Sequence, residues 1–233
     1  MKSPIVLLSD FSTAGPSVGL LKAAILGRDP NARIVDYCHD VPPRDIWSAA
    51  YLLMTGAAYF PKGSLFVTLV ASGEGLHRRL LWCRTADHQF LLADNACISW
   101  LAAKQPLIEI RHLGNEKYWA PRASRAFPGR DIFGQVAGSL NRGLSPSKLG
   151  KTVRVCDRMP FPSVTVKEGR SQGTILAVDG LGNAVTNLQA QHVKPGARIR
   201  FRGKDFDARL NASAFFQLRL KARPGDPVSA RRP

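Results

Sequence analysis

The chain has 233 residues, 45% of them hydrophobic and 21% charged, which is an ordinary globular composition with enough length for a sizeable core. No apolar run approaches the roughly 18 residues that a membrane-spanning helix needs, and the chain enters a predicted strand directly, without a signal peptide. The four cysteines are widely spaced and follow no zinc-binding pattern. We therefore predict reduced thiols, no metal site and a cytoplasmic protein.

The formal net charge of +16 is spread unevenly along the chain. Residues 151–233 hold 16 Lys and Arg against 6 Asp and Glu, and residues 1–150 hold 17 against 11. A basic surface favours anionic partners, nucleic acid among them. No recognition helix, RNP-type motif or zinc finger accompanies the charge, so the sequence does not favour nucleic acid over a merely solvated basic surface.

Residues 5–9 form an apolar run that ends at Ser9 and Asp10, and residues 18–26 have a helical pattern. A strand of this kind is typical of a parallel sheet covered on both faces, in which ligands bind beyond the carboxyl ends of the strands. A carboxylate at this position can accept hydrogen bonds from a vicinal diol such as a ribose. A second interpretation stays open, in which Asp10 caps the helix or completes a turn.

Strands and helices continue to alternate as far as residue 140. The predicted strands are 32–37, 64–70, 80–83, 89–92 and 107–112, and the predicted helices are 46–54, capped by Asp45, and 129–140. Polar or glycine-containing stretches follow three of the strands, at Asp10, at residues 71–75 and at Asp94-Asn95. We expect these stretches to converge at one edge of the sheet.

The pattern changes in the last third of the chain. We predict an α/β domain with a largely parallel sheet over residues 1–155, a linker over 156–172 and a small β-barrel-like domain over 173–233. Pro160 and Pro162 favour the linker, and short alternating strands begin at Gly173.

Six short motifs resemble the S-adenosylmethionine (SAM) hydroxide adenosyltransferases, relatives of the fluorinase and chlorinase enzymes, and they occur in the family's order. They are Leu8-Ser9-Asp10-Phe11, His-Asp-Val-Pro-Pro-Arg-Asp-Ile at 39–46, Tyr-Phe-Pro-Lys-Gly at 59–63, Ala93-Asp94-Asn95, Phe-Pro-Gly-Arg-Asp-Ile-Phe at 127–133 and Asp-Gly-Leu-Gly-Asn-Ala-Val-Thr-Asn at 179–187. The resemblance implies an α/β domain followed by a barrel-like domain. It also implies a homotrimer that binds SAM between one subunit's first domain and a neighbour's second.

The resemblance further implies attack of water or halide on ribose C5′ of SAM, with methionine leaving as a neutral thioether and no cofactor beyond the substrate. Asp10 would bind the ribose hydroxyls. The ligand-binding residues that the resemblance implies are Asp10, Ser12, Thr13, Asp94 and Asn95 in the first domain, and Asp179 and Asn183 in the second.

The chain also departs from the family. Hydrolytic members position water with an Asp, an Arg and a His, and the corresponding residues here are Ala71, Arg78 and Pro128. Arg78 is thus the one candidate catalytic residue that the resemblance carries over. Gly15 replaces an aspartate that contacts the methionine ammonium. The family's C-terminal motifs are not recognisable, as expected of a shortened second domain.

Three hypotheses follow. The first is an enzyme that hydrolyses SAM to adenosine and methionine with weak or altered activity. The second is a catalytically degraded homologue that binds an adenosine-type ligand or a partner. The third is a basic nucleic-acid binder that uses the C-terminal domain. His39, which precedes the Pro42-Pro43 loop, is either a hydrogen-bonded structural residue or a catalyst.

Overall fold

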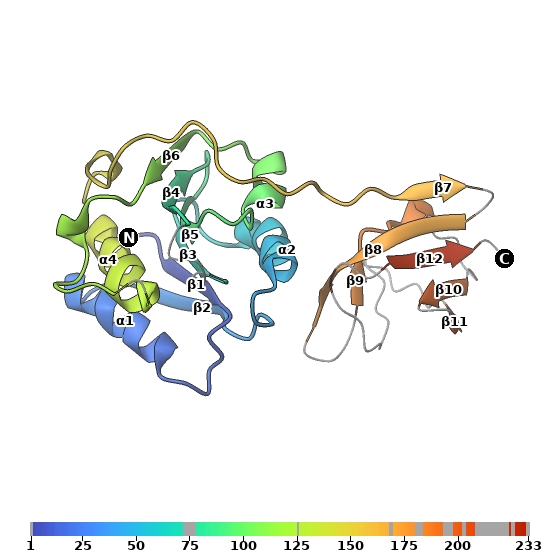
Figure 1. The fold of residues 1–233 in the computed structure, drawn as a ribbon, viewed down its shortest axis with the longest axis horizontal. Helices are drawn as coiled ribbons and strands as arrows, with labels where there is room; N and C mark the ends of the chain where they lie inside the picture. The colour runs from blue at the N-terminus through green and yellow to red at the C-terminus, as the bar shows by residue number, and fades with distance from the viewer. Residues whose placement is uncertain are drawn as a thin grey trace. The chain divides into compact units, whose positions relative to one another are not determined.

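The computed structural model of the protein describes residues 2–71, 78–124, 126–167, 170–179, 184–192, 198–201, 204–207, 224 and 227–231. The chain divides into two compact units, residues 1–159 and 160–233 (Figure 1). Within the segment predicted as a linker, residues Thr165–Lys167 form a strand and another strand begins at Arg170.

The first unit is built on a six-stranded sheet with the order β2-β1-β3-β5-β4-β6. Its strands are β1 (Ile5–Ser9), β2 (Ile34–Cys38), β3 (Leu65–Leu69), β4 (Leu80–Arg84), β5 (Gln89–Ala93) and β6 (Glu109–His112). Strands β2, β1, β3 and β5 are parallel to one another, and β4 runs antiparallel to both β5 and β6. The predicted strands, the largely parallel sheet and the pairing of 80–83 with 89–92 are confirmed.

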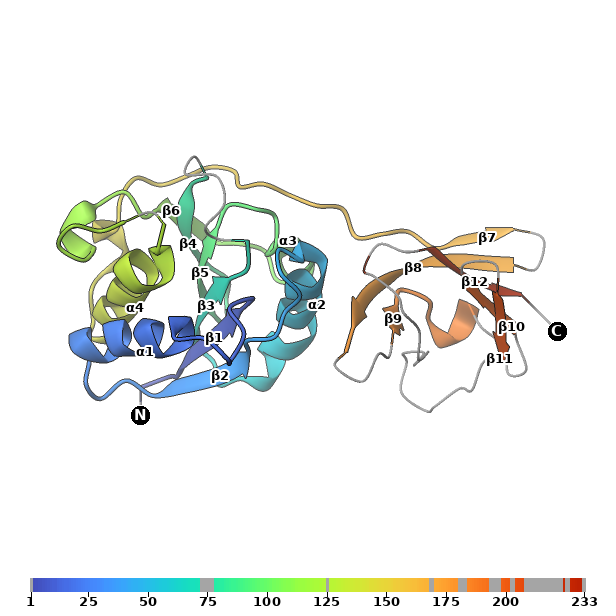
Figure 2. The same ribbon diagram turned by 60° about the horizontal axis from the view of Figure 1, so that its bottom comes forward.

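Helices cover both faces of this sheet (Figures 1 and 2). Helices α1 (Ser17–Arg28) and α4 (Gly134–Asn141) lie together on one face, and α2 (Ile46–Gly56) and α3 (Ser99–Lys104) lie on the other. In β1, Ile5 and Leu7 pack toward α1, whereas Val6 and Leu8 pack toward α2. Both faces of β1 are buried, which explains its unbroken apolar sequence. No helix in the described part of the chain is long and apolar enough to cross a membrane.

Two glycines allow α1 and α4 to pack closely. A Cβ on Gly138 would lie 2.6 Å from the carbonyl oxygen of Ile25, and one on Gly134 would lie 2.8 Å from the Cβ of Ala24. The sequence predicted one helix over 129–140. The structure instead has a π-helical turn, η3 (Gly129–Phe133), that leads into α4.

Short helical turns complete the first unit, and one further turn lies in the second. They are η1 (Ala57–Tyr59), η2 (Glu116–Tyr118), η4 (Pro146–Lys148) and η5 (Ala190–His192). Helix α2 begins where predicted, because the Asp45 carboxylate accepts the backbone N–H of Ser48 at 3.0 Å. Helix α3 was not predicted, since it is only six residues long and no side chain caps it.

The second unit is an antiparallel sheet with the order β11-β10-β12-β8-β7, and β9 also pairs with β8. Its strands are β7 (Thr165–Lys167), β8 (Arg170–Val178), β9 (Ala184–Thr186), β10 (Arg198–Phe201), β11 (Lys204–Asp207) and β12 (Pro227–Arg231). Among the described strands, no pairing closes the sheet between β11 and β7. The structure therefore shows an antiparallel sheet in the second unit, and the predicted barrel is not shown among the described strands.

All four cysteines are free thiols. Cys83, Cys97 and Cys156 are buried in the core between the sheet and helices α2 and α3. Burial raises the pKa of Cys97 to about 12, so this thiol stays protonated near neutral pH. The cysteines thus contribute to packing, as their spacing suggested.

His88 makes the stability of the first unit depend on pH. Its buried ring packs edge-on against Phe66 and Phe90, and its Nδ1 atom has no hydrogen-bond partner among the described residues. Burial lowers the pKa of His88 below its ordinary value of 6.5, so the unfolded chain binds this proton more readily than the folded one. The stability is therefore complete above about pH 6.5 and is expected to fall as the pH drops below that value.

We expect His88→Gln to flatten this part of the pH profile, measured by urea unfolding between about pH 5 and 7. The largest slope that one proton can cause is about 1.4 kcal/mol per pH unit. All four tryptophans lie within residues 1–159, so their fluorescence reports this unit. His112→Gln is the control and should leave the slope in place. An unchanged slope in His88→Gln would rule out this origin.

Candidate functional site

The carboxyl ends of the parallel strands form one edge of the first unit's sheet. The chain leaves β1 through α1 toward β2, whereas it leaves β3 in the opposite direction, toward β4 and β5. Ligand crevices of open α/β sheets form where neighbouring strands diverge in this way. Asp10 follows β1 and Ala71 lies just beyond β3, so both residues stand at this point.

The Asp10 carboxylate holds two loops together at the edge. Its Oδ2 atom accepts the backbone N–H of Arg44 and the backbone N–H of Ala71, both at 3.0 Å. Asp10 does not cap α1, whose first turn has no side-chain cap. In the part of the chain that the structure describes, no hydrogen bond reaches the other oxygen, Oδ1. The half-buried carboxylate is therefore held in place by one oxygen, and its Oδ1 atom can accept hydrogen bonds from a ligand.

The backbone around Asp10 is strained. Ser12, Arg44 and Ala71 have φ angles of 58°, 64° and 49°, in the left-handed region that non-glycine residues rarely adopt. Each such residue costs roughly 1–2 kcal/mol. All three are hydrogen-bonded here, because Ser12 donates its N–H to the carbonyl of His39 at 2.8 Å and the other two donate to Asp10. Strain that the surroundings hold in this way is typical of functional sites.

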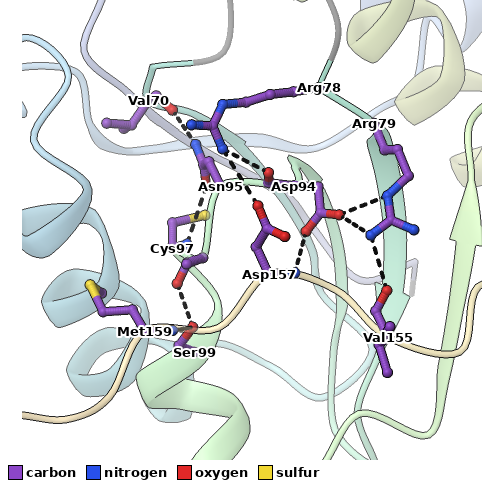
Figure 3. Close-up of polar contacts among 11 residues, drawn as sticks. Val70, Arg78, Arg79, Asp94, Asn95, Cys97, Ser99, Val155, Asp157 and Met159 are labelled. Atoms are coloured by element: carbon purple, nitrogen blue, oxygen red, sulfur yellow. Dashed lines mark hydrogen bonds and ion pairs between the residues drawn. The ribbon is translucent and has the colours of Figure 1, made fainter.

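The edge continues from β3 to β5 through side-chain hydrogen bonds (Figure 3). The amide of Asn95 donates to the carbonyl of Val70 at 2.9 Å, so it fixes the residue before Ala71. The guanidinium of Arg78 donates to the carbonyl of Asp94 at 3.0 Å and lies 3.7 Å from the carboxylate of Asp157. Asp10, Ala71 and Asp94-Asn95 thus meet at one edge, as predicted for these strand ends, whereas residues 72–75 of the second predicted stretch lie outside the described residues.

An apolar hollow of about 240 Å³ is lined by Phe11, the residue after Asp10, although Asp10 itself does not line it. Its walls also include Leu20 of α1 and Phe127 and Pro128 just before η3. A Cβ on Gly129 would lie 3.2 Å from the ring of Phe11, so the motif at 127–133 packs against the residue next to Asp10. A mostly apolar hollow with a few polar groups in its wall, here Ser17 and Arg130, is the usual composition of a small-molecule site.

The remaining predicted ligand residues are more scattered. Ser12 and Thr13 are exposed in the turn after β1, and the Ser12 hydroxyl accepts the N–H of Ala14 at 3.2 Å. Asp179 is exposed at the end of β8 in the second unit, and Asn183 lies outside the described residues. Among the described residues, no group of three or more His, Cys, Asp or Glu side chains is placed to hold a metal ion.

Comparison with known proteins identifies the family. A profile of the SAM hydroxide adenosyltransferase N-terminal domain matches residues 5–150. The chain belongs to the SAM hydroxide adenosyltransferase family. It is 33% identical to (R)-S-adenosyl-L-methionine hydrolase of Thermus thermophilus over 79% of this chain and 74% of that protein. It is 26% identical to the enzyme of the same name from Methanocaldococcus jannaschii, over 81% and 68% respectively.

The fold is likewise similar to a solved structure. The crystal structure of an uncharacterized conserved protein from Thermotoga maritima superposes with a TM-score of 0.87 and 25% sequence identity. The match covers 98% of this chain and all of that one. The similarity of fold therefore extends over nearly the whole chain.

The three positions that the resemblance predicts to replace the family's water-positioning residues are Ala71, Arg78 and Pro128. Ala71 donates its N–H to Asp10, and Pro128 is buried in the wall of the hollow. The Arg78 side chain is half exposed and reaches the end of β5. Neither the alanine nor the proline side chain can accept a proton.

The carboxylate of Asp94 is fully engaged in structural hydrogen bonds, which its motif did not predict. Its carboxylate accepts two hydrogen bonds from the guanidinium of Arg79, at 2.9 and 2.5 Å, and one from the backbone N–H of Asp157 at 2.7 Å (Figure 3). Arg79 also donates to the carbonyl of Val155 at 3.1 Å. Arg79 and Asp94 thus fasten the segment after residue 154 to β4 and β5. No local pattern in the sequence indicated this pairing, because Arg79 and Asp94 are 15 residues apart.

We expect Arg79→Met to lower the free energy of unfolding of the first unit by about 2 kcal/mol, because it leaves the buried Asp94 carboxylate without its charged donor. Urea unfolding followed by tryptophan fluorescence measures the change. Arg84→Met is the matched control. Arg84 is equally exposed but pairs loosely with Glu109 at 3.7 Å, so its replacement should cost no more than about 0.5 kcal/mol. Equal losses in both variants would contradict the special role of Arg79.

Proposed function

We propose that this protein binds SAM, or a closely related adenosyl compound, and hydrolyses it slowly to adenosine and methionine. The family membership and the SAM hydrolase activity named for two of its relatives support the reaction class. The observation that carries the proposal is the fixed Asp10 carboxylate at the diverging ends of β1 and β3. Its second oxygen can accept the hydroxyls of a ribose.

The reaction places modest demands on the protein. The oxygen of water forms a bond to ribose C5′, the C5′–S bond breaks, and methionine leaves as a neutral thioether while the water proton passes to solvent. No acid is needed for the leaving group, so positioning and exclusion of bulk water supply most of the catalysis. Asp10 would hold the ribose, and the apolar hollow lined by the adjacent Phe11 would keep bulk water away from the reacting atoms.

The low rate follows from the side chains around the site. Arg78 can orient water or a polar substrate group, but Ala71 and Pro128 provide neither a base nor an acceptor. A positioned general base typically contributes about 10²–10⁴-fold. Binding of an adenosine-type ligand without turnover is the second candidate function, and it rests on the same Asp10 geometry together with these two replacements.

Calorimetry with SAM, adenosine and methionine, followed by chromatography of the SAM incubation, separates the two functions. Slow release of adenosine supports hydrolysis, and binding of SAM or adenosine without release supports the second function. If neither compound binds at millimolar concentration, both proposals are wrong.

We also propose a homotrimer in which a barrel-like second unit of a neighbouring subunit, with Asp179 and Asn183, completes the ligand site. The half-buried Asp10 and the open hollow of the first unit are consistent with a site that needs a further wall. Light scattering at micromolar concentration is expected to give three times the 25.5 kDa mass of the chain. A monomer mass would exclude this arrangement and weaken the hydrolase proposal.

A further inference from the structure

The buried His39 lies in the middle of a hydrogen-bonded chain that begins directly before Asp10. The Ser9 hydroxyl oxygen is 2.7 Å from Nδ1 of His39, and Nε2 of His39 is 3.0 Å from a carboxylate oxygen of Asp36. Lys22 of α1 donates to the other carboxylate oxygen of Asp36 at 2.6 Å. Ser9 has no exposed surface and His39 is 4% exposed, so the hydrogen bond between these two side chains is closed to solvent.

The direction of these hydrogen bonds follows from their partners. The Asp36 carboxylate is paired with the Lys22 ammonium, so it is ionised and can only accept. Nε2 of a neutral His39 must therefore carry the hydrogen, and Nδ1 is left as an acceptor. The Ser9 hydroxyl then donates to Nδ1, and its oxygen is free to accept the backbone N–H of Phe11 at 3.4 Å.

His39 is bound to both sides of Asp10. Its ring holds the Ser9 side chain, which is one residue before Asp10, and its carbonyl accepts the N–H of Ser12 two residues after it. Ser12 is one of the strained residues, so its φ angle of 58° is kept by this contact with His39. The turn that carries Asp10 is thus tied at its start and at its end to one residue.

We infer that His39 is a positioning residue for the ribose-binding carboxylate, and that its ring acts on Asp10 through Ser9 while its backbone carbonyl fixes Ser12. The inference rests on the proposed function and specifies which residue holds its site in shape. A nucleophilic role for Ser9 is excluded by its burial, since a substrate cannot reach a hydroxyl with no exposed surface.

Two amide replacements separate the two ring contacts. The side-chain amide of Asn ends near the position of Nδ1, whereas that of Gln ends near the position of Nε2. His39→Asn therefore keeps a partner for Ser9, and His39→Gln keeps one for Asp36 but leaves the buried Ser9 hydroxyl unpaired. We expect His39→Gln to weaken SAM and adenosine binding by about tenfold, and His39→Asn by less than about threefold.

His88→Asn is the matched control for loss of a buried histidine. His88 is 3% exposed and lies in the turn between β4 and β5, away from the edge that carries Asp10. This variant should lower stability and leave the affinity unchanged. All variants are compared at 25 °C under conditions in which circular dichroism shows them folded. Equal loss of affinity in both His39 variants, or none in either, would overturn the inference.

A second measurement does not depend on ligand binding. The amide protons of Arg44 and Ala71 are hydrogen-bonded to Asp10, so their NMR chemical shifts report the position of its carboxylate. His39→Gln should move both resonances, and His39→Asn and His88→Asn should leave them close to their original values. If the unmodified protein binds neither SAM nor adenosine, the proposed function fails and these resonances alone decide the role of His39. Unmoved resonances in His39→Gln would refute it.

Discussion

Replacing Asp10 by asparagine is expected to weaken binding of SAM and adenosine at least tenfold while the protein stays folded. The amide oxygen of Asn can still accept the N–H groups of Arg44 and Ala71, so the two loops keep their common partner. The amide NH₂ then faces the ligand, and the ribose hydroxyls meet donors where they had an ionised acceptor. Loss of a hydrogen bond to a charged group costs roughly 1.5–3 kcal/mol, which corresponds to a factor of ten or more.

Isothermal calorimetry measures this change. Asp87→Asn is the control. Asp87 lies in the turn between β4 and β5, pairs with the exposed Lys62 and takes no part in the site. Affinities that are equal in Asp10→Asn and in the unmodified protein would show that Asp10 only holds the loops together and that the ribose binds elsewhere.

Joint replacement of Ala71 by Asp and Pro128 by His is expected to raise the rate of SAM hydrolysis by about 10²–10⁴-fold. The structure makes the first replacement feasible, because Ala71 has a φ of 49°, a conformation that aspartate tolerates better than alanine. Pro128 has an ordinary helical φ of −62°, and its side chain faces the hollow. The two changes are made together because groups that act as a unit have non-additive effects.

Adenosine release under saturating SAM, followed by chromatography, gives the rate. The control pair is Ala71→Asn with Pro128→Gln, which matches the shapes roughly but supplies no base and should leave the rate near that of the unmodified protein. Fast turnover in the unmodified protein, unchanged by the Asp-His pair, would mean that other residues build the nucleophile site.

Local patterns were enough to place the main elements of the first unit. The unbroken apolar run at residues 5–9 predicted a strand buried on both faces, and β1 is packed on both sides by helices. Asp45 predicted the start of α2, because an aspartate before an apolar helical run satisfies an otherwise unpaired N–H. These signals are local, since each depends on residues within one or two turns of the chain. Helix α3 and the π turn η3 lacked such signals.

The sequence also determined which strand ends carry polar groups, but tertiary contacts decided what those groups do. Asp10 and Asp94 both follow buried strands and look alike in sequence. In the fold, Asp94 is surrounded by Arg79 and the N–H of Asp157, from segments 15 and 63 residues away, and its carboxylate is used structurally. Asp10 receives two backbone N–H groups on one oxygen and keeps the other available. The difference arises because hydrogen-bond partners distant in sequence meet only after the sheet has formed, and no local pattern records them.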